Sequence, residues 1–229
     1  LKSKNKLQGI DSDYEYAEWY EKTRPTEAEL QRQRETVFDD TAPLFSIVIP
    51  LFETPTVYLK ALLDSLLAQT YTKFEVCLAD GSRPGKDTEA ALRDYATRDS
   101  RIRYTVLGEN RGIAGNTNAA LALATGDFVV LCDHDDILPP EALFSFAEAI
   151  VKEPETDCLY SDEDKLDMDG GSLFDPHFKP DFNLDLLGSV NYICHLFAVR
   201  KSLLDTVGQF DAAYDGAQDY DFIFRVTEK

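Results

Sequence analysis

The chain has 229 residues, of which 44% are hydrophobic and 28% charged, a composition typical of one sizeable α/β domain or two small ones. Its 42 acidic residues outnumber 23 basic residues, so the net charge is −19. This balance argues against a nucleic-acid partner and against a polybasic membrane anchor, because both need clustered basic side chains.

The four cysteines lie far apart in apolar runs, without the spacing of a zinc site. They are typical of buried free thiols in a reducing compartment. We therefore expect a cytoplasmic protein, with the inner face of the membrane and peripheral association there left open. No apolar run is long enough for a transmembrane segment. The chain starts with Leu1 rather than methionine, so we expect it to be part of a longer polypeptide.

Residues 1–40 are highly charged, and helices are predicted at 13–21 and 26–37. Thr26 is a suitable N-cap because glutamates follow it in the first turn. The segment is too polar for a core of its own. It is therefore predicted to be a helical appendage that packs on the main domain or on a partner.

From residue 41 to 136, strand-like and helix-like segments alternate. Strands are predicted at 44–50, 74–79, 102–107 and 127–132, with helices at 54–69 and 87–97 and from the glycine-bearing turn at 108–115 to about 124. Thr54 and Pro55 fit the N-cap and first position of the first of these helices. The alternation predicts right-handed crossovers and an open, mostly parallel sheet flanked by helices. Ligands of such sheets bind outside the carboxyl ends of the strands.

The fourth predicted strand ends in Asp133, His134, Asp135 and Asp136. Three carboxylates in four positions need water or a cation, because a buried charge needs a partner. In an extended backbone alternate side chains share a face, so Asp133 and Asp135 would point together. A divalent cation with a bound diphosphate suits such a pair. A solvated acidic turn is the alternative for an isolated motif, and for His134 a structural role is the alternative to a binding role.

The second half, 137–229, has a different pattern. A helix is predicted at 139–152, strands at 158–160 and 192–199, a hairpin turn at 169–171 and a helix after residue 218. This half is predicted to be a small mixed or antiparallel part. Because the chain stops within the last helix, we expect Phe222 and Phe224 to lack full cover.

Several other kinds of site are excluded because the chain lacks their sequence motifs. A dinucleotide site needs glycines where residues 51–55 read LFETP, and neither a P-loop nor a nucleophile elbow is present. The acidic run at 162–171 does not fit an EF-hand, since Lys165 and Pro176 would occupy ligand positions one and twelve. A metal-bound diphosphate ligand on a parallel sheet remains.

Five segments then appear in a characteristic order: FSIVIP (45–50), LADGS (78–82), ENRGIAGNTNAAL (109–121), ATGDFVVLCDHDD (124–136) and GAQDYD (216–221). With them the chain resembles the family-2 glycosyltransferases of the GT-A fold. YSDEDK (160–165), PHFKPDF (176–182) and NYICH (191–195) resemble a bacterial branch that assembles cell-surface polysaccharides and includes rhamnosyltransferase-like proteins.

The resemblance implies a GT-A (Rossmann-like) domain at 41–229, with a nucleotide-binding half at 41–136 and an acceptor half at 137–229. It implies inverting, metal-dependent transfer of a sugar from a UDP- or dTDP-sugar donor to a saccharide or lipid-linked saccharide acceptor. The expected cofactor is Mn²⁺ or Mg²⁺. Such proteins continue beyond the position of Lys229, so closure of the acceptor side is expected from residues outside this chain.

The resemblance also assigns roles to residues. The nucleotide-sugar site is expected to comprise Pro50, Phe52, Glu53, Asp80, Arg111, Asn118, Asp133, His134 and Asp135. Of these, Asp80 would bond the base, Asp133 and Asp135 would bind the metal, and Asp219 would be the general base. Candidates for contact with the donor sugar or acceptor are Asp162, Glu163, Lys179, His195 and Gln218. Glu53 stands where the family often has asparagine, and Gln218 where glutamate is commoner.

Some of these residues keep an alternative role. Asp162 and Glu163 also fit surface charges, Lys179 fits loop packing, and His195 fits a satisfied histidine in a strand core. A nucleotide-sugar-binding domain without turnover is the second functional hypothesis. A sugar-phosphate nucleotidylyltransferase is the third, but it predicts a glycine-rich basic loop after the first strand, where residues 51–54 are neither.

Overall fold

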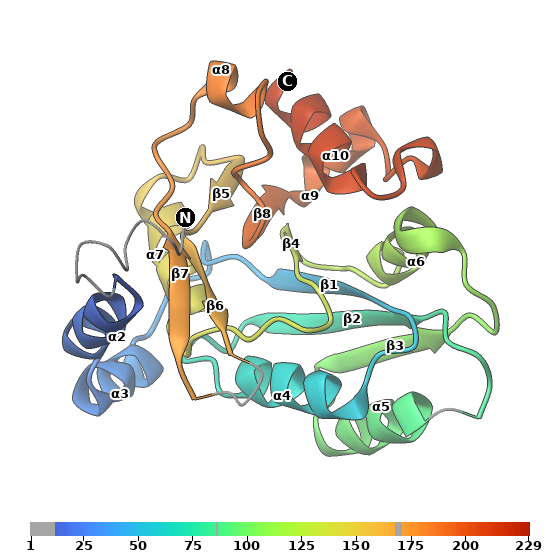
Figure 1. Cartoon of the computed structure of the whole chain (residues 1–229), viewed down its shortest axis with the longest axis horizontal. Helices are drawn as coiled ribbons and strands as arrows, with labels where there is room; N and C mark the ends of the chain where they lie inside the picture. The colour runs from blue at the N-terminus through green and yellow to red at the C-terminus, as the bar shows by residue number, and fades with distance from the viewer. Residues whose placement is uncertain (1–11, 86, 168–170) are drawn as a thin grey trace.

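The computed structural model describes residues 12–85, 87–167 and 171–229 (Figure 1). Two helices precede the main domain, α2 (Ser12–Thr23) and α3 (Glu27–Glu35). Thr26 caps α3 as predicted: its hydroxyl accepts the Glu29 N–H at 3.3 Å, and the Glu29 carboxylate accepts the Thr26 N–H at 2.7 Å. This reciprocal capping box satisfies two N–H groups that the start of a helix leaves unpaired.

A six-stranded sheet forms the centre of the molecule. Its strands are β1 (Phe45–Leu51), β2 (Phe74–Asp80), β3 (Ile102–Val106), β4 (Phe128–Leu131), β5 (Cys158–Tyr160) and β8 (Phe197–Arg200). Their order is β3-β2-β1-β4-β8-β5. The first four are parallel to one another, and β8 runs antiparallel to both β4 and β5. The mostly parallel open sheet expected from the sequence is confirmed.

Helices cover both faces of this sheet (Figure 1). On one face lie α4 (Thr56–Leu67), α5 (Asp87–Arg98) and α7 (Ala142–Lys152), and on the other lie α6 (Gly112–Leu121), α9 (Lys201–Val207) and α10 (Gln218–Thr227). In β1, Ile47 and Ile49 belong to the first core and Val48 to the second. This double burial explains why β1 is an uninterrupted apolar run rather than an alternating one.

One carboxylate is buried within the sheet. Glu75 of β2 accepts hydrogen bonds from the Ser46 hydroxyl at 2.7 Å, the Thr125 N–H at 2.5 Å and the Arg103 guanidinium at 2.8 Å. Burial alone would raise the pKa of Glu75, but these hydrogen bonds outweigh it and lower the pKa to about 2. Glu75 therefore ties the turn before β4 to β1, β2 and β3.

A separate hairpin, β6 (Glu163–Leu166) and β7 (Leu173–His177), lies beside the main sheet (Figure 1). The hairpin turn predicted at 169–171 falls mainly on residues outside the described part. The N-terminal helix α2 packs on this hairpin (Figure 1). Tyr16 and Trp19 contact Phe178 edge to face, with ring centroids 6.1 and 5.3 Å apart. The N-terminal segment thus packs on the main domain. The short helix α8 (Leu184–Leu187) and the 3₁₀ turn η1 (Ala212–Tyr214) complete the second half.

Three local predictions are wrong. Helix α4 begins at Thr56 with Pro55 as its N-cap, and the buried Thr54 hydroxyl does not cap it. The strand predicted at 192–199 is confirmed only from Phe197; the backbone of residues 193 and 195 bonds instead to the side chains of Lys179 and Glu163. Phe222 is fully buried and stacks on Phe210 at 4.5 Å, so the expected lack of cover is wrong for Phe222, whereas Phe224 is only partly buried. None of the helices in the described ranges is both long and apolar enough to cross a bilayer.

Candidate active site

Eight of the nine ligand-binding residues predicted in the first half lie along the carboxyl edge of the parallel strands. They are Pro50, Phe52 and Glu53 around the end of β1, Asp80 at the end of β2, Arg111 before α6, and Asp133, His134 and Asp135 after β4. Because neighbouring parallel strands end at the same edge, residues as far apart in sequence as Pro50 and Asp133 become neighbours here.

A small cavity marks the centre of this edge. Its volume is about 20 Å³, enough for one water molecule, and five predicted site residues line it: Pro50, Asp133, His195, Gln218 and Asp219. The remaining wall is mostly apolar and includes Val48, Ile113 and Phe210. The cavity therefore brings together the end of β1, the acidic run after β4 and the start of α10.

Asp133 is paired with His195 in this cavity. The imidazole Nε2 lies 3.2 Å from the Asp133 carboxylate. The hydrogen bond from His195 lowers the pKa of Asp133, against the effect of burial. Burial alone would lower the pKa of His195, but its bond to Asp133 and its contact with Cys194 raise it instead. His195 thus lies outside the strand, and its interpretation as a satisfied histidine in a strand core is wrong, because its ring pairs with Asp133.

The backbone of the acidic run at 133–136 is not extended. The extended conformation from which Asp133 and Asp135 were expected to point together is therefore wrong. Residues 134 and 135 form a turn, and the Asp136 carboxylate accepts the Asp133 N–H at 3.1 Å. Asp135 lies on the outside of this turn with 60% of its side chain exposed, 3.7 Å from the His134 imidazole. Burial raises the pKa of Asp136, and the hydrogen bond that it accepts from the Asp133 N–H stabilises the turn.

Asp133 and Asp135 can complete the coordination of a divalent cation only with oxygen atoms from a bound substrate. Within the described part of the chain, no group of three potential ligands is assembled for a metal ion. Asp133 and the exposed Asp135 provide two carboxylates at one turn. Two carboxylates plus phosphate oxygens are a common coordination for Mg²⁺ and related cations. The donor set therefore suits an ion that arrives with a diphosphate.

Asp219 lies in the first turn of α10, where the helix dipole favours a carboxylate. The Asn191 side-chain amide donates to its Oδ2 at 2.8 Å, which fixes the orientation of the carboxylate. Gln218 accepts the Gly216 N–H at 2.9 Å and so stabilises the loop before the helix. Asn191 was not predicted from the sequence, because nothing in the NYICH segment separates it from an ordinary loop residue.

At the nucleotide side, the loops after β1 and β2 are joined. Glu53 has a positive φ of 51°, and its N–H donates to the Ser82 hydroxyl at 2.8 Å. Its carboxylate accepts the Arg83 N–H at 3.3 Å. Asp80 is 2% exposed and accepts the Ser82 N–H at 2.9 Å. A left-handed conformation in a residue other than glycine is uncommon and is frequent at functional sites.

The start of α6 is held by a residue that sequence reasoning missed. Asn116 accepts the Arg111 N–H at 3.1 Å and donates to Asn110 at 3.0 Å and to the Leu51 carbonyl at 3.4 Å. It is buried, and its amide lies against Gly81, where a Cβ would be 2.7 Å from it. A glycine is therefore needed at 81 for this close approach, and Asn116 links the ends of β1 and β2 to Arg111.

Asn118, by contrast, forms its side-chain hydrogen bonds within the protein. Its amide donates to the Phe210 carbonyl at 2.8 Å and accepts the Phe210 N–H at 3.0 Å. Both ends of the side chain thus hold the turn after α9. We do not include Asn118 among the donor-binding residues proposed below.

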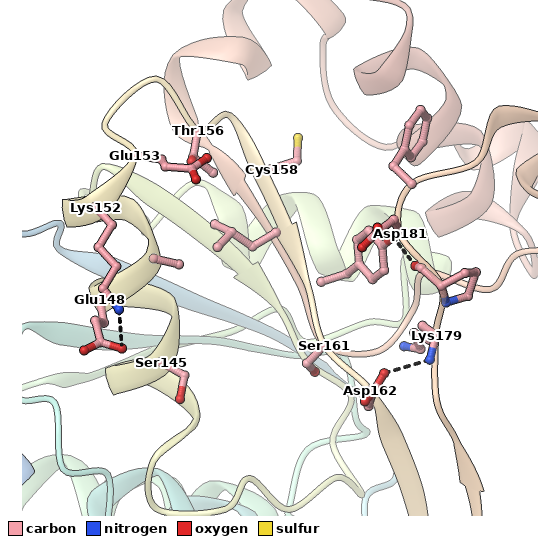
Figure 2. A pocket seen from close by; sticks show the side chains of 15 residues that line it. Ser145, Glu148, Lys152, Glu153, Thr156, Cys158, Ser161, Asp162, Lys179 and Asp181 are labelled. Atoms are coloured by element: carbon pink, nitrogen blue, oxygen red, sulfur yellow. Dashed lines mark hydrogen bonds and ion pairs between the residues drawn. The ribbon is translucent and has the colours of Figure 1, made fainter.

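The remaining candidates lie at the base of the hairpin, beside a groove of about 800 Å³ between α7, the edge strand β5 and residues 179–182 (Figure 2). Asp162 and Lys179 line this groove, and the Asp162 carboxylate accepts the Lys179 N–H at 2.7 Å. The Lys179 ammonium bonds to the carbonyl of His195, which lines the small cavity. Lys179 and the backbone around residue 195 therefore link the groove to the cavity.

Comparisons with known proteins agree with this fold. The fold is of the GT-A class, and it is shared with solved structures of that class. The model of the family described as "Glycosyl transferase family 2" matches residues 46–208, more than half of the chain, and the chain therefore belongs to glycosyltransferase family 2.

Three similar proteins illustrate this relationship. The O-antigen biosynthesis protein RfbC of Myxococcus xanthus is 38% identical over 81% of this chain and 14% of its own length. TarS of S. aureus has a TM-score of 0.64 at 25% identity, covering 80% of this chain and 54% of the solved one. The mannosyltransferase PcManGT of Pyrobaculum calidifontis, solved with GDP-Man and Mn²⁺, has a TM-score of 0.57 at 23% identity over 86% of this chain and 57% of that one. This chain thus spans only a small part of the curated relative and about half of each solved chain.

Proposed function

We propose that this chain transfers a sugar, with inversion, from a nucleoside-diphosphate sugar to a saccharide or lipid-linked saccharide acceptor in surface-polysaccharide synthesis. The observation that carries the proposal is the small cavity in which Asp219 and Asp133 line one space at the carboxyl edge of a family-2 fold. The name of RfbC supports the polysaccharide context, and the solved complexes of TarS with UDP and UDP-GlcNAc support a UDP-type donor, with dTDP as the alternative.

The donor is proposed to lie along the carboxyl edge of β1, β2 and β4. Asp80 would bond the base, and Pro50, Phe52, Glu53 and Arg111 would line the nucleotide. Asp135 and Asp133 would hold Mn²⁺ or Mg²⁺, a proposal that the Mn²⁺ complex of PcManGT supports. When bound, the cation neutralises charge on the departing diphosphate. His134 would orient Asp135, which it neighbours at 3.7 Å.

Asp219 is proposed as the general base. Its carboxylate would take the proton of the acceptor hydroxyl while that oxygen bonds to the anomeric carbon, and the bond from this carbon to the diphosphate would break with its electron pair on the phosphate oxygen. Asn191 would hold the carboxylate on the acceptor side. Gln218 would fix the loop beside it, and Asp162 would face the acceptor from the groove. A single displacement of this kind inverts the configuration of the anomeric carbon.

The location is proposed to be the cytoplasm, including the inner face of the membrane. The free cysteines support a reducing compartment, with Cys77 and Cys132 buried as reduced thiols. Membrane association would then be peripheral and would follow the acceptor.

Asp219→Asn tests the assignment of the base, with Asp205→Asn, an exposed aspartate on α9, as the matched control. Donor affinity should be unchanged in both variants. Transfer and donor hydrolysis should fall about 10²–10⁴-fold in Asp219→Asn only, the usual contribution of a general base. Near wild-type transfer by Asp219→Asn would remove this residue as the base. Nucleotide binding by the unsubstituted chain without any turnover would instead select the binding-domain hypothesis.

A further inference from the structure

Lys179 is a buried lysine whose ammonium is used entirely within the protein. Its side chain is 0% exposed. The ammonium donates to the carbonyl of His195 at 2.7 Å, to the carbonyl of Ile193 at 3.0 Å and to the Glu163 carboxylate at 3.3 Å. A buried charge is costly unless it is paired and hydrogen-bonded. Lys179 meets this condition by binding the backbone of residues 193–195.

Glu163, the first residue of β6, binds the same segment. Its Oε2 accepts the backbone N–H of His195 at 2.6 Å, and its Oε1 lies 3.2 Å from the His177 imidazole. Both backbone groups of His195 are therefore held by charged side chains of the hairpin region. These bonds replace the strand pairing that the apolar sequence around His195 would otherwise favour.

His195, whose backbone is held in this way, is also the residue whose side chain contacts Asp133. His195 places its Nε2 3.2 Å from the Asp133 carboxylate. We infer that Lys179 and Glu163 are positioning residues for Asp133: they fix the backbone of His195 so that its imidazole holds this carboxylate in one orientation. The inference rests on the proposed function, in which Asp133 binds the metal–diphosphate group.

Helix α2 supports the hairpin from outside. The Tyr16 hydroxyl donates to the Asp164 carboxylate at 2.5 Å, and Trp19 packs on Phe178, the residue before Lys179. A continuous series of contacts thus runs from α2 through the hairpin and His195 to Asp133. Trp19 is the only tryptophan of the chain, so its fluorescence reports on the hairpin.

The test replaces Lys179 by methionine, which keeps the length of the side chain and removes its charge. Lys165→Met is the matched control, because Lys165 is in the hairpin that precedes Lys179 but is 63% exposed in its ion pair with Asp175. Three measurements are made at pH 7: the NMR signal of the His195 ring, assigned among the three histidines of the chain by single substitutions, the affinity for UDP with Mg²⁺ by calorimetry, and the Trp19 emission.

In Lys179→Met we expect the His195 ring signal to move and the affinity for UDP with Mg²⁺ to fall about 10–100-fold, the usual effect of losing a partner of a ligating group. The Trp19 emission should shift as well. Lys165→Met should match the unsubstituted chain in all three. If Lys179→Met is folded and its His195 signal stays in place, the inference is refuted, even if the melting temperature falls.

If Lys179→Met does not fold, Glu163→Gln provides a second test of the inference. The amide oxygen can still accept the His195 N–H, but the charge facing Lys179 is lost, so a smaller displacement of the same ring signal is expected. An unmoved signal in this variant also refutes the inference. If the unsubstituted chain does not bind UDP with Mg²⁺, the proposed function loses support, while the His195 signal still tests the positioning on its own.

Discussion

The buried carboxylate of Glu75 permits a quantitative prediction. Glu75→Gln keeps the shape of the side chain but removes its charge, and it presents an amide donor toward groups that already donate, such as the Thr125 N–H. The folded protein lowers the pKa of Glu75 from 4.5 to about 2. At roughly 1.4 kcal/mol for each pKa unit, the ionised form contributes about 3 kcal/mol to the free energy of unfolding.

The sign of the pH dependence follows from the direction of this change. Because the pKa is lower in the folded than in the unfolded chain, the contribution is complete above about pH 4.5 and is lost as the pH falls toward 2. Urea unfolding of both proteins at pH 7 and pH 3 measures it. The difference in free energy of unfolding should be about 3 kcal/mol at pH 7 and about 1 kcal/mol at pH 3. In a thermal scan at pH 7 the variant should melt about 6–12 °C lower.

Glu89→Gln is the control, since Glu89 forms an exposed ion pair with Arg93 at 2.7 Å. Exposed pairs contribute little to stability, so its melting temperature should stay close to that of the unsubstituted chain. An equal difference at pH 7 and pH 3 for Glu75→Gln would refute the reasoning, because a packing defect has no reason to follow the charge of this carboxylate.

Three further substitutions test the site. Asp135→Ala should abolish the difference in nucleotide affinity between Mg²⁺ and EDTA. It should not unfold the protein, because the side chain is 60% exposed. If the unsubstituted chain binds nucleotide equally well in Mg²⁺ and in EDTA, the metal assignment is contradicted. Asp80→Ala should weaken UDP binding about 10–100-fold, because a hydrogen bond to a charged group is lost, and should leave pyrophosphate binding unchanged. An equal loss of pyrophosphate affinity would place Asp80 outside the base pocket. Asn118→Ala should lower the free energy of unfolding by about 2 kcal/mol, for two lost hydrogen bonds to Phe210, with normal nucleotide affinity. A normal stability with weakened affinity would return Asn118 to the donor site.

The parallel half of the sheet could be predicted because its signals are local. Strands buried on both faces are continuous apolar runs such as 44–50, and the carboxylates that cannot enter the core mark where they end. The same reasoning failed at 192–196, where an equally apolar run is not a strand. Its backbone partners are Lys179 and Glu163, and the period of apolar residues carries no information about distant side chains that bind a backbone.

The site was predictable as a set of residues but less so in its geometry. The acidic run identified Asp133 and Asp135, but the turn at 134–135 depends on the Asp136 carboxylate bonding back to the Asp133 N–H. Likewise, Asn116 and Asn118 are two positions apart on one helix, and only the fold shows that the first links strand ends while the second holds Phe210.

The place of β8 in the sheet has a consequence for how this chain can be divided. β4 obtains its second neighbour only from Phe197–Arg200, and within the described sheet β5 pairs with β8 alone. During synthesis from the N-terminus, the edge of β4 therefore stays open until residue 200 has left the ribosome. An open apolar edge is a template for aggregation. A piece of the chain that ends at residue 136, the boundary proposed for the nucleotide-binding half, should consequently be insoluble when expressed alone, since β4 completes its pairing only with β8.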